Sequence, residues 1–395
     1  MNCNWTVPNT MKNQVQNGYL TTPLILFYII LLAGCGRSAG PVLEEGEAAL
    51  ITLEEVLRLG DESAGDTILF GPIAQIAVNG NGEILVSESP RSPLVHVFES
   101  DGTYLSRVGD QGQGPGEFRY LSGAAIGAAD SVYLWELVLN RILIYDPDDF
   151  SYVRSTEVRD DGKKEFNFLI GGIGDGWIMT KSLDPFLESD DGSMTINTNT
   201  HYELIKVNRD GSYGTDILGT VDEYEMIYNL GEGGVMHFLW TPFGRSPSFA
   251  VGPDDMLYYG WSDEIEIITV SADGSTRDTI RYEHEPVPIT DAEMAEAMPE
   301  EPNYRELVAA REPHETKPAF QTFLVDEMSR IWIRLSSPED AVRAEWLILS
   351  QESHAVGRTT LPATVDLEVI RGGFAYGTHQ GDGDAPMVVV YKIQD

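Results

Sequence analysis

The chain has 395 residues, of which 26 are Lys or Arg and 63 are Asp or Glu, giving a formal net charge of -37 at pH 7. This charge argues against a nucleic-acid partner, because such a site needs a basic patch that displaces counterions from phosphates. Anionic lipid surfaces are disfavoured for the same reason. With 42% hydrophobic and 10% aromatic residues, the chain can bury a sizeable core. Its 39 Gly and 21 Pro favour short strands and tight turns over long helices.

The N-terminal segment has the features of an export signal. An apolar run from Leu24 to Ala33 spans about half of the roughly 20 residues that a membrane-crossing helix needs, and it fits the h-region of a secretory signal. The tetrad Leu32-Ala33-Gly34-Cys35 resembles the lipobox of bacterial lipoproteins, which implies cleavage before Cys35 and lipidation of that cysteine. The alternative is a short buried helix that ends in an ordinary cysteine.

This interpretation divides the chain into a signal peptide (1–34), a small, polar and acidic tether (35–47) and a body (48–395). The start codon stays open between Met1 and Met11, because Met11-Lys12 makes a more ordinary signal start. Gly36, not Asp, follows Cys35, and the resemblance therefore implies the outer membrane, facing either the periplasm or the cell exterior. We expect the lipid on Cys35 to provide the membrane contact while the acidic body stays in solution.

The body is built from a repeated pattern. Each repeat begins with an apolar strand, a tight turn and a second apolar or aromatic strand, and Gly, Asn and Asp occupy the turns because they tolerate positive φ. The six copies are Ile73 to Val86, Leu121 to Trp135, Phe166 to Met179, Ser246 to Tyr259, Phe320 to Ile333 and Val365 to Tyr376. A third strand, often with a fourth, follows each copy. A unit of about 45 residues predicts a propeller with four antiparallel strands per blade.

The two ends of the body complement each other. The sixth repeat stops after its third strand, Met387 to Ile393, whereas Ala48 to Val56 is an apolar strand without a partner in its own neighbourhood. We predict that this early strand completes the sixth blade as its outermost strand, which closes the ring and removes an exposed edge. The predicted fold is all-β, a six-bladed β-propeller.

One part of the body resembles a known family. The stretch from Ile73 to Phe118, in particular Phe98 to Leu105 and the run Gly112-Gln113-Gly114-Pro115-Gly116-Glu117-Phe118, looks like an NHL-type repeat. The whole chain is similar to six-bladed propeller lipoproteins of bacteria, although the other blades lack the Gly-Pro-Gly-Glu-Phe connection. The resemblance implies a binding or scaffold module, because only a minority of such propellers are lyases or lactonases.

The long loops are predicted to share one end of the ring, because strands alternate in direction. The largest, Glu283 to Pro318, lies between the fourth and fifth blades and contains two capping boxes that each predict a short helix. The boxes are Thr290 with Glu293 and Asn303 with Glu306, and the helices are Asp291 to Met298 and Tyr304 to Arg311. Whether the pair forms a fixed cap or a mobile lid stays open.

Motifs for catalysis are scarce in the sequence. There is no P-loop, no Gly-x-Ser-x-Gly elbow and no zinc-type pairing among the seven His, so no nucleophilic triad is predicted. Cationic and aromatic residues predicted on the long-loop end are the candidate ligand-binding set: Arg91, Arg119, Trp240, Arg245, Lys317 and His379. The cations would orient a carboxylate or sugar acid, with Trp240 as a stacking face. The alternative is internal ion pairing with the many carboxylates.

The leading functional prediction is a non-catalytic, lipid-anchored extracytoplasmic module that binds a protein or a saccharide and needs no cofactor. The alternative is a propeller hydrolase, lactonase or lyase of the gluconolactonase kind. For that activity the resemblance implies Ca²⁺ or another divalent ion, held by Glu, Asn and Asp at the mouth of the central channel. Glu117, Asn167 and Asp366 lie near the starts of different innermost strands and form the candidate metal set.

Overall fold

A computed structural model describes residues 48–62, 68–88, 93–127, 130–159, 165–183, 186–188, 194–196, 201–230, 236–338, 341–379 and 386–394. They belong to one compact unit, Glu45–Asp395. The predicted signal peptide, Cys35 and the tether lie outside the described residues. No helix in the described ranges is long and apolar enough to cross a membrane.

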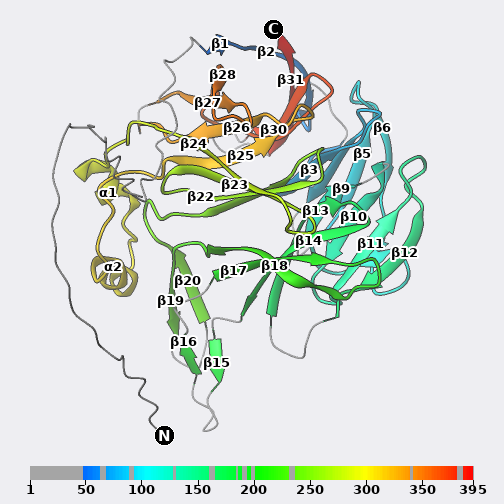
Figure 1. Ribbon diagram of the computed structural model, residues 1–395, viewed down its shortest axis with the longest axis horizontal. Helices are drawn as coiled ribbons and strands as arrows, with labels where there is room; N and C mark the ends of the chain where they lie inside the picture. The colour runs from blue at the N-terminus through cyan, green and yellow to red at the C-terminus, as the bar shows by residue number, and fades with distance from the viewer. Residues whose placement is uncertain are drawn as a thin grey trace, which may run out of the picture. The chain divides into compact units, whose positions relative to one another are not determined.

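Six antiparallel sheets of four strands each form the blades of a propeller, as predicted (Figure 1). Blade 1 consists of β3 (Ile73–Val78), β4 (Ile84–Glu88), β5 (Val95–Phe98) and β6 (Tyr104–Arg107). Blade 2 consists of β9 (Leu121–Ile126), β10 (Val132–Glu136), β11 (Arg141–Tyr145) and β12 (Tyr152–Glu157). Blade 3 consists of β13 (Glu165–Ile173), β14 (Gly176–Leu183), β17 (His201–Val207) and β18 (Tyr213–Asp222). Blade 4 consists of β21 (Pro247–Val251), β22 (Met256–Trp261), β23 (Ile265–Ser271) and β24 (Arg277–Tyr282). Blade 5 consists of β25 (Phe320–Val325), β26 (Ile331–Leu335), β27 (Arg343–Leu349) and β28 (Ala355–Pro362). Blade 6 consists of β29 (Val365–Arg371), β30 (Phe374–His379), β31 (Met387–Gln394) and β2 (Thr52–Leu59). The first strands of successive blades contact one another around the whole ring, including β29 with β3.

The N-terminal strand closes the ring, as the sequence predicts. Strand β2 pairs antiparallel with β31 and is the outermost strand of blade 6. A second contact was not predicted: β1 (Ala49–Leu50) pairs in parallel with β28 of blade 5, and the Ile51 N–H donates to the Arg358 carbonyl at 2.9 Å. The early segment therefore joins blades 5 and 6 to each other.

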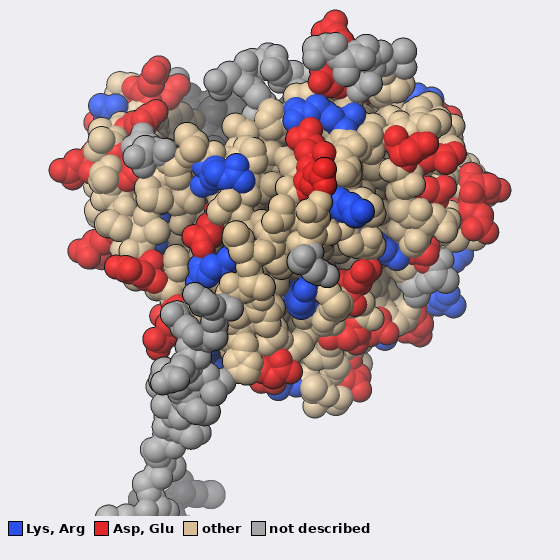
Figure 2. Space-filling view, turned by 90° about the horizontal axis from the view of Figure 1, so that it is seen from above, with Lys and Arg blue, Asp and Glu red and all other residues tan. Residues whose placement is uncertain are grey.

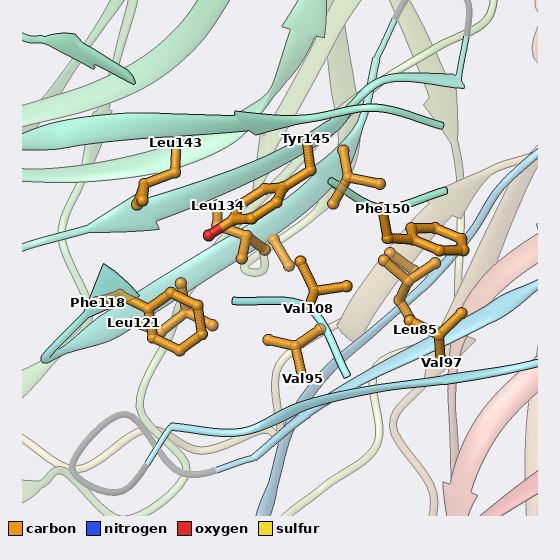
Figure 3. Packing of buried hydrophobic residues seen from close by; sticks show 13 residues of the cluster. Leu85, Val95, Val97, Val108, Phe118, Leu121, Leu134, Leu143, Tyr145 and Phe150 are labelled. Atoms are coloured by element: carbon orange, nitrogen blue, oxygen red, sulfur yellow. The ribbon is translucent and has the colours of Figure 1, made fainter. Parts of the chain in front are cut away.

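The hydrophobic core is divided into six clusters, one between each pair of adjacent blades. Between blades 1 and 2, Leu85 and Val97 belong to the same cluster as Leu134 and Leu143, and all four side chains are buried (Figure 3). Neighbouring blades cover both faces of each sheet. The middle strands therefore carry apolar side chains on both faces. Full burial of one such side chain stabilises the fold by about 1.5–3 kcal/mol.

The insertions carry two helices and two further hairpins. Helix α1 (Asp291–Ala297) follows a complete capping box between Thr290 and Glu293, which confirms the first predicted box. The second predicted box, Asn303 with Glu306, is wrong: α2 (Pro302–Ala309) is capped by Glu301 without a side-chain hydrogen bond, because Pro302 takes the first helical position. The hairpins, which the sequence did not predict, pair β15 (Phe186–Glu188) with β16 (Met194–Ile196) and β19 (Met226–Leu230) with β20 (Met236–Trp240).

The helical insertion is fixed to the blades at its base. Lys317 forms an ion pair with Glu293, which is buried at the start of α1, and donates to the Ser337 carbonyl at 2.8 Å. Arg311, just after α2, donates to the Met226 carbonyl of β19 at 3.1 Å. These contacts tie the two ends of the insertion to blade 5 and to β19, and the choice between a fixed cap and a mobile lid stays a prediction.

Candidate functional site

The Gly-rich connection between blades 1 and 2 has a well-defined shape. Its two ends, β7 (Asp110–Gln111) and β8 (Glu117–Phe118), pair in parallel, and Gly109 and Gly116 have φ of 65° and 73°, which L side chains rarely adopt. The Glu117 carboxylate turns back on its own loop and accepts a hydrogen bond from the Gly114 N–H at 2.8 Å. A Cβ at Gly112 would overlap the same carboxylate, so a larger residue there would displace the Glu117 side chain.

Blade 2 supports the loop from beneath. The Arg141 guanidinium donates to the Glu117 carbonyl at 2.7 Å and to the Gly114 carbonyl at 3.3 Å. The Tyr145 hydroxyl donates to the Gly116 carbonyl at 2.9 Å, and burial raises the pKa of Tyr145, so the hydroxyl remains a donor at any physiological pH. Three carbonyl oxygens of the loop are thus held by donors from β11.

A cavity of about 660 Å³ lies beside this loop and is lined by Gln111, Gly112, Gln113 and Arg119. Arg119 is exposed and makes no ion pair with any described residue. Its guanidinium presents a planar set of donors, and each glutamine adds an amide donor and a carbonyl acceptor. Arg119 belongs to the predicted set, whereas the two glutamines do not. Their position in the Gly-rich run was the signal that could have identified them.

Trp240 lies at the end of β20, with 58% of its surface exposed. Its ring meets Tyr224 edge-to-face with 5.3 Å between centroids, and Tyr224 meets Tyr202 in the same way at 6.4 Å. The exposed indole therefore rests on an aromatic support and offers a stacking surface.

Arg245 and Lys317 make internal contacts. The Arg245 guanidinium is buried; it donates to Asp263 at 2.8 Å and to the Thr316 carbonyl of the helical insertion at 2.9 Å. Lys317 pairs with Glu293, as described above, and its ammonium lies 5.8 Å from the centre of the Phe243 ring. Both side chains join the insertion to its surroundings, which is the internal pairing that the sequence left open as an alternative.

The last two members of the predicted ligand-binding set differ from the others. His379 ends β30, is half-buried, and its Nδ1 is buried without a hydrogen-bond partner among the described residues. Arg91 lies outside the described residues. Of the predicted set, Arg119 lines a cavity, Trp240 is exposed, and Arg245 and Lys317 are engaged within the fold.

The three candidate metal ligands each have partners of their own. Glu117 accepts from Gly114, and Asp366 forms an ion pair with Arg334. The Asn167 amide donates to the Tyr213 hydroxyl at 3.0 Å, and its Oδ1 is buried without a described partner. No contact recorded for the described residues joins one of the three to another, and no group of three or more His, Cys, Asp or Glu there fits a metal ion. The candidate metal set stays a prediction, and each of its three side chains is held by a partner of its own.

Charge is distributed without a basic patch on the face drawn in Figure 2. Lys and Arg occur there singly or in small groups among Asp and Glu.

The chain is similar to several known propellers. The family model DUF5128, described as a 6-bladed beta-propeller, matches residues 63–168, the part that holds blades 1 and 2. No curated protein matches this chain. A protein from Bacteroides fragilis, described provisionally as exported, is similar with 11% identity and a TM-score of 0.48, over 89% of this chain and 98% of that chain.

Two more solved structures show the range of proteins with this architecture. A member of the duf4221 family from Bacteroides vulgatus has 9% identity and a TM-score of 0.48, over 88% of this chain and 100% of that chain. A gluconolactonase from Xanthomonas campestris has 14% identity and a TM-score of 0.46, over 89% of this chain and 99% of that chain. Likeness of this degree does not transfer a function.

Proposed function

We propose that this chain is a non-catalytic binding module of the cell envelope, anchored through a lipid on Cys35 at the outer membrane, which binds a saccharide carrying a carboxylate. The observation that carries the proposal is the cavity beside the Gly-rich loop, in which Arg119 lies with Gln111 and Gln113. The anchor and the address rest on the export signal and on the tetrad that ends at Cys35.

The chemistry of the cavity suits such a ligand. A guanidinium binds a carboxylate through two parallel hydrogen bonds, and the two glutamine amides can each pair with a sugar hydroxyl as donor or acceptor. The loop that carries them is held in shape by Glu117, Arg141 and Tyr145, so little conformational entropy is lost when the ligand binds. Preorganised polar groups in a concave site are typical of small-molecule recognition.

The net charge of -37 sets a limit on the ligand. Exposed charges farther apart than about 8 Å are largely screened at physiological salt, so one carboxylate beside Arg119 is little affected by the distant acidic surface. The charges of a long polyanion would lie close to many carboxylates of the protein, which would repel them. We therefore expect short uronic-acid saccharides to bind better than polymeric ones.

Isothermal titration with glucuronic and galacturonic acid disaccharides, compared with the matching neutral disaccharides, tests the proposal. We expect only the acidic sugars to bind, and Arg119→Ala to weaken binding about tenfold or more, because a charge-assisted pair is lost. Arg119→Lys should recover part of the affinity, since it restores the charge but not the planar donor pair.

The matched control is Arg209→Ala, which removes another exposed arginine that has no ion pair with described residues and lies in the turn between β17 and β18. It changes the net charge by the same amount and should leave binding unchanged. Equal weakening by the Arg119 and Arg209 variants, or equal binding of neutral and acidic sugars, would overturn the proposal.

A further inference from the structure

A second cavity, of about 550 Å³, lies between blades 3 and 4, and the proposed saccharide site does not use it. It opens between β17 and β18 on one side and β22 and β23 on the other. Its lining has two parts, an apolar floor and an acidic rim. The floor residues are Val221, Tyr259, Gly260, Trp261 and Ile268, and the rim residues are His201, Thr220, Asp222, Asp263, Glu264 and Glu266.

The floor of the cavity is rigid. Tyr259 is 1% exposed, and its hydroxyl accepts a hydrogen bond from Arg277, whose guanidinium lies 5.6 Å from the centre of the ring. Val221 is buried beside it, and Trp261 is half-buried and packs against the same blade 3 and blade 4 cluster. Trp261 and Ile268 keep part of their surface open in the cavity, so a methylene chain placed on these two side chains would exchange water for aromatic and aliphatic contact.

The four rim carboxylates fall into two pairs with different surroundings. Asp263 pairs with Arg245 at 2.8 Å and Glu266 pairs with Arg281 at 2.7 Å, so their charges are compensated within the protein. Asp222 and Glu264 are exposed and form no ion pair in the described part of the chain. The rim therefore presents two uncompensated negative charges, one from blade 3 and one from blade 4, above an apolar floor.

We propose that this cavity binds an aliphatic diamine or polyamine. The methylene chain would lie on Trp261 and Ile268, and the ammonium groups would pair with Asp222 and Glu264. An ammonium near an aromatic face gains further from the ring quadrupole. The net charge of the chain, -37, raises the local concentration of organic cations and speeds their arrival. This site shares no residue with the saccharide cavity, so either proposal can fail alone.

The test is isothermal titration of the full chain with 1,5-diaminopentane, 1-aminopentane and 1,5-pentanediol. These probes keep the five-carbon chain and carry two, one and no ammonium groups. We expect the diamine to bind about tenfold more tightly than the monoamine and the diol not to bind, because each ammonium has its own carboxylate. Equal affinity of the diamine and the monoamine would overturn the proposal.

Variants separate the cavity from the general acidity of the protein. Asp222→Asn combined with Glu264→Gln should weaken diamine binding about tenfold or more. The control, Glu99→Gln combined with Glu157→Gln, neutralises two exposed carboxylates of blades 1 and 2 and should have no effect. Equal losses in the two double variants would show attraction to the overall charge and not a site.

A steric variant gives an independent readout. Thr220 is exposed at the rim, so Thr220→Trp should fill the cavity without disturbing the fold and should abolish diamine binding at an unchanged melting temperature. Retained binding in this variant would place the diamine elsewhere and refute the assignment.

Discussion

The Glu368 carboxylate accepts a hydrogen bond from the Ile76 N–H, with 2.6 Å between Oε2 and N. Glu368 lies in a bulge of β29, where the register with β30 shifts between Leu367 and Val369, and Ile76 belongs to β3. This contact joins the innermost strands of blades 6 and 1 at the seam where the ring closes. Gln75 makes a related contact at the next seam, accepting from the Ala124 N–H of blade 2 at 2.8 Å.

The stability of the ring should depend on the ionisation of Glu368. Burial raises the pKa of this carboxyl from 4.5 to about 7, so between these values the folded protein holds a proton that the unfolded chain has lost. The free energy of unfolding therefore has a contribution that is complete below pH 4.5 and is lost as the pH rises to about 7. Glu368→Gln keeps an acceptor for Ile76 without the charge.

We expect Glu368→Gln to stabilise the protein by up to about 3 kcal/mol above neutral pH and to have little effect in acid, since one pKa unit corresponds to about 1.4 kcal/mol. Urea unfolding of the variant and the parent over a pH series measures this difference. A difference in the free energy of unfolding that is constant at every pH would show that the pKa of Glu368 is the same in the folded and unfolded chains.

Arg245 should be important for stability, because its guanidinium bonds to Asp263, Thr316 and Phe243 and is 5% exposed. We expect Arg245→Ala to lower the free energy of unfolding by about 3 kcal/mol, because the buried side chain and its hydrogen bonds to three residues are lost together. Arg281→Ala is the control: its pair with Glu266 is exposed, and its loss should cost under about 1 kcal/mol. Similar values from chemical denaturation for the two variants would contradict this distinction.

The closure of the ring can be tested with two neighbouring residues. Ile51 is 8% exposed and belongs to the core cluster between blades 5 and 6, whereas Leu50 is 80% exposed. Ile51→Ala should destabilise the protein by about 2–4 kcal/mol, and Leu50→Ala should change stability by less than about 0.5 kcal/mol. Thermal and urea unfolding measure both. An inert Ile51→Ala variant would mean that the N-terminal segment does not hold the last two blades together.

The two cysteines allow a test of the lipid anchor. Cys35→Ser should abolish incorporation of labelled fatty acid and move the protein from the detergent phase to the aqueous phase of a Triton X-114 extraction, because the lipid is the membrane contact we propose. Cys3→Ser, which alters the other cysteine, should change neither result. Labelling that persists in Cys35→Ser would refute the anchor.

A divalent ion should not stabilise the protein through the candidate metal set. Its three members already have partners: Glu117 with Gly114, Asp366 with Arg334 and Asn167 with Tyr213. We expect the melting temperature to be the same with EDTA and with millimolar Ca²⁺. A rise with Ca²⁺ that disappears in Asn167→Ala would instead support the metal-dependent alternative.

The amino-acid sequence alone determined the blades, since strand alternation and turn residues are local signals that repeat along the chain. It also predicted the pairing of the early strand with the last blade, because β31 lacked an outer partner, and the capping box at Thr290, whose residues are three apart. The capping box predicted at Asn303 was wrong, because Pro302 occupies the first helical position and the helix begins there without a side-chain cap.

Only the tertiary structure decided which polar side chains are engaged and which line cavities. Glu368 and Ile76 are 292 residues apart, and Arg245 and Thr316 are 71 apart, so both hydrogen bonds exist only in the folded chain, and the first also needs the ring to close. The sequence placed Arg119 and Arg245 in one candidate set because both are cations in long connections. The fold surrounds Arg245 with acceptors and leaves Arg119 at an open cavity, a difference set by packing between blades that no local pattern records.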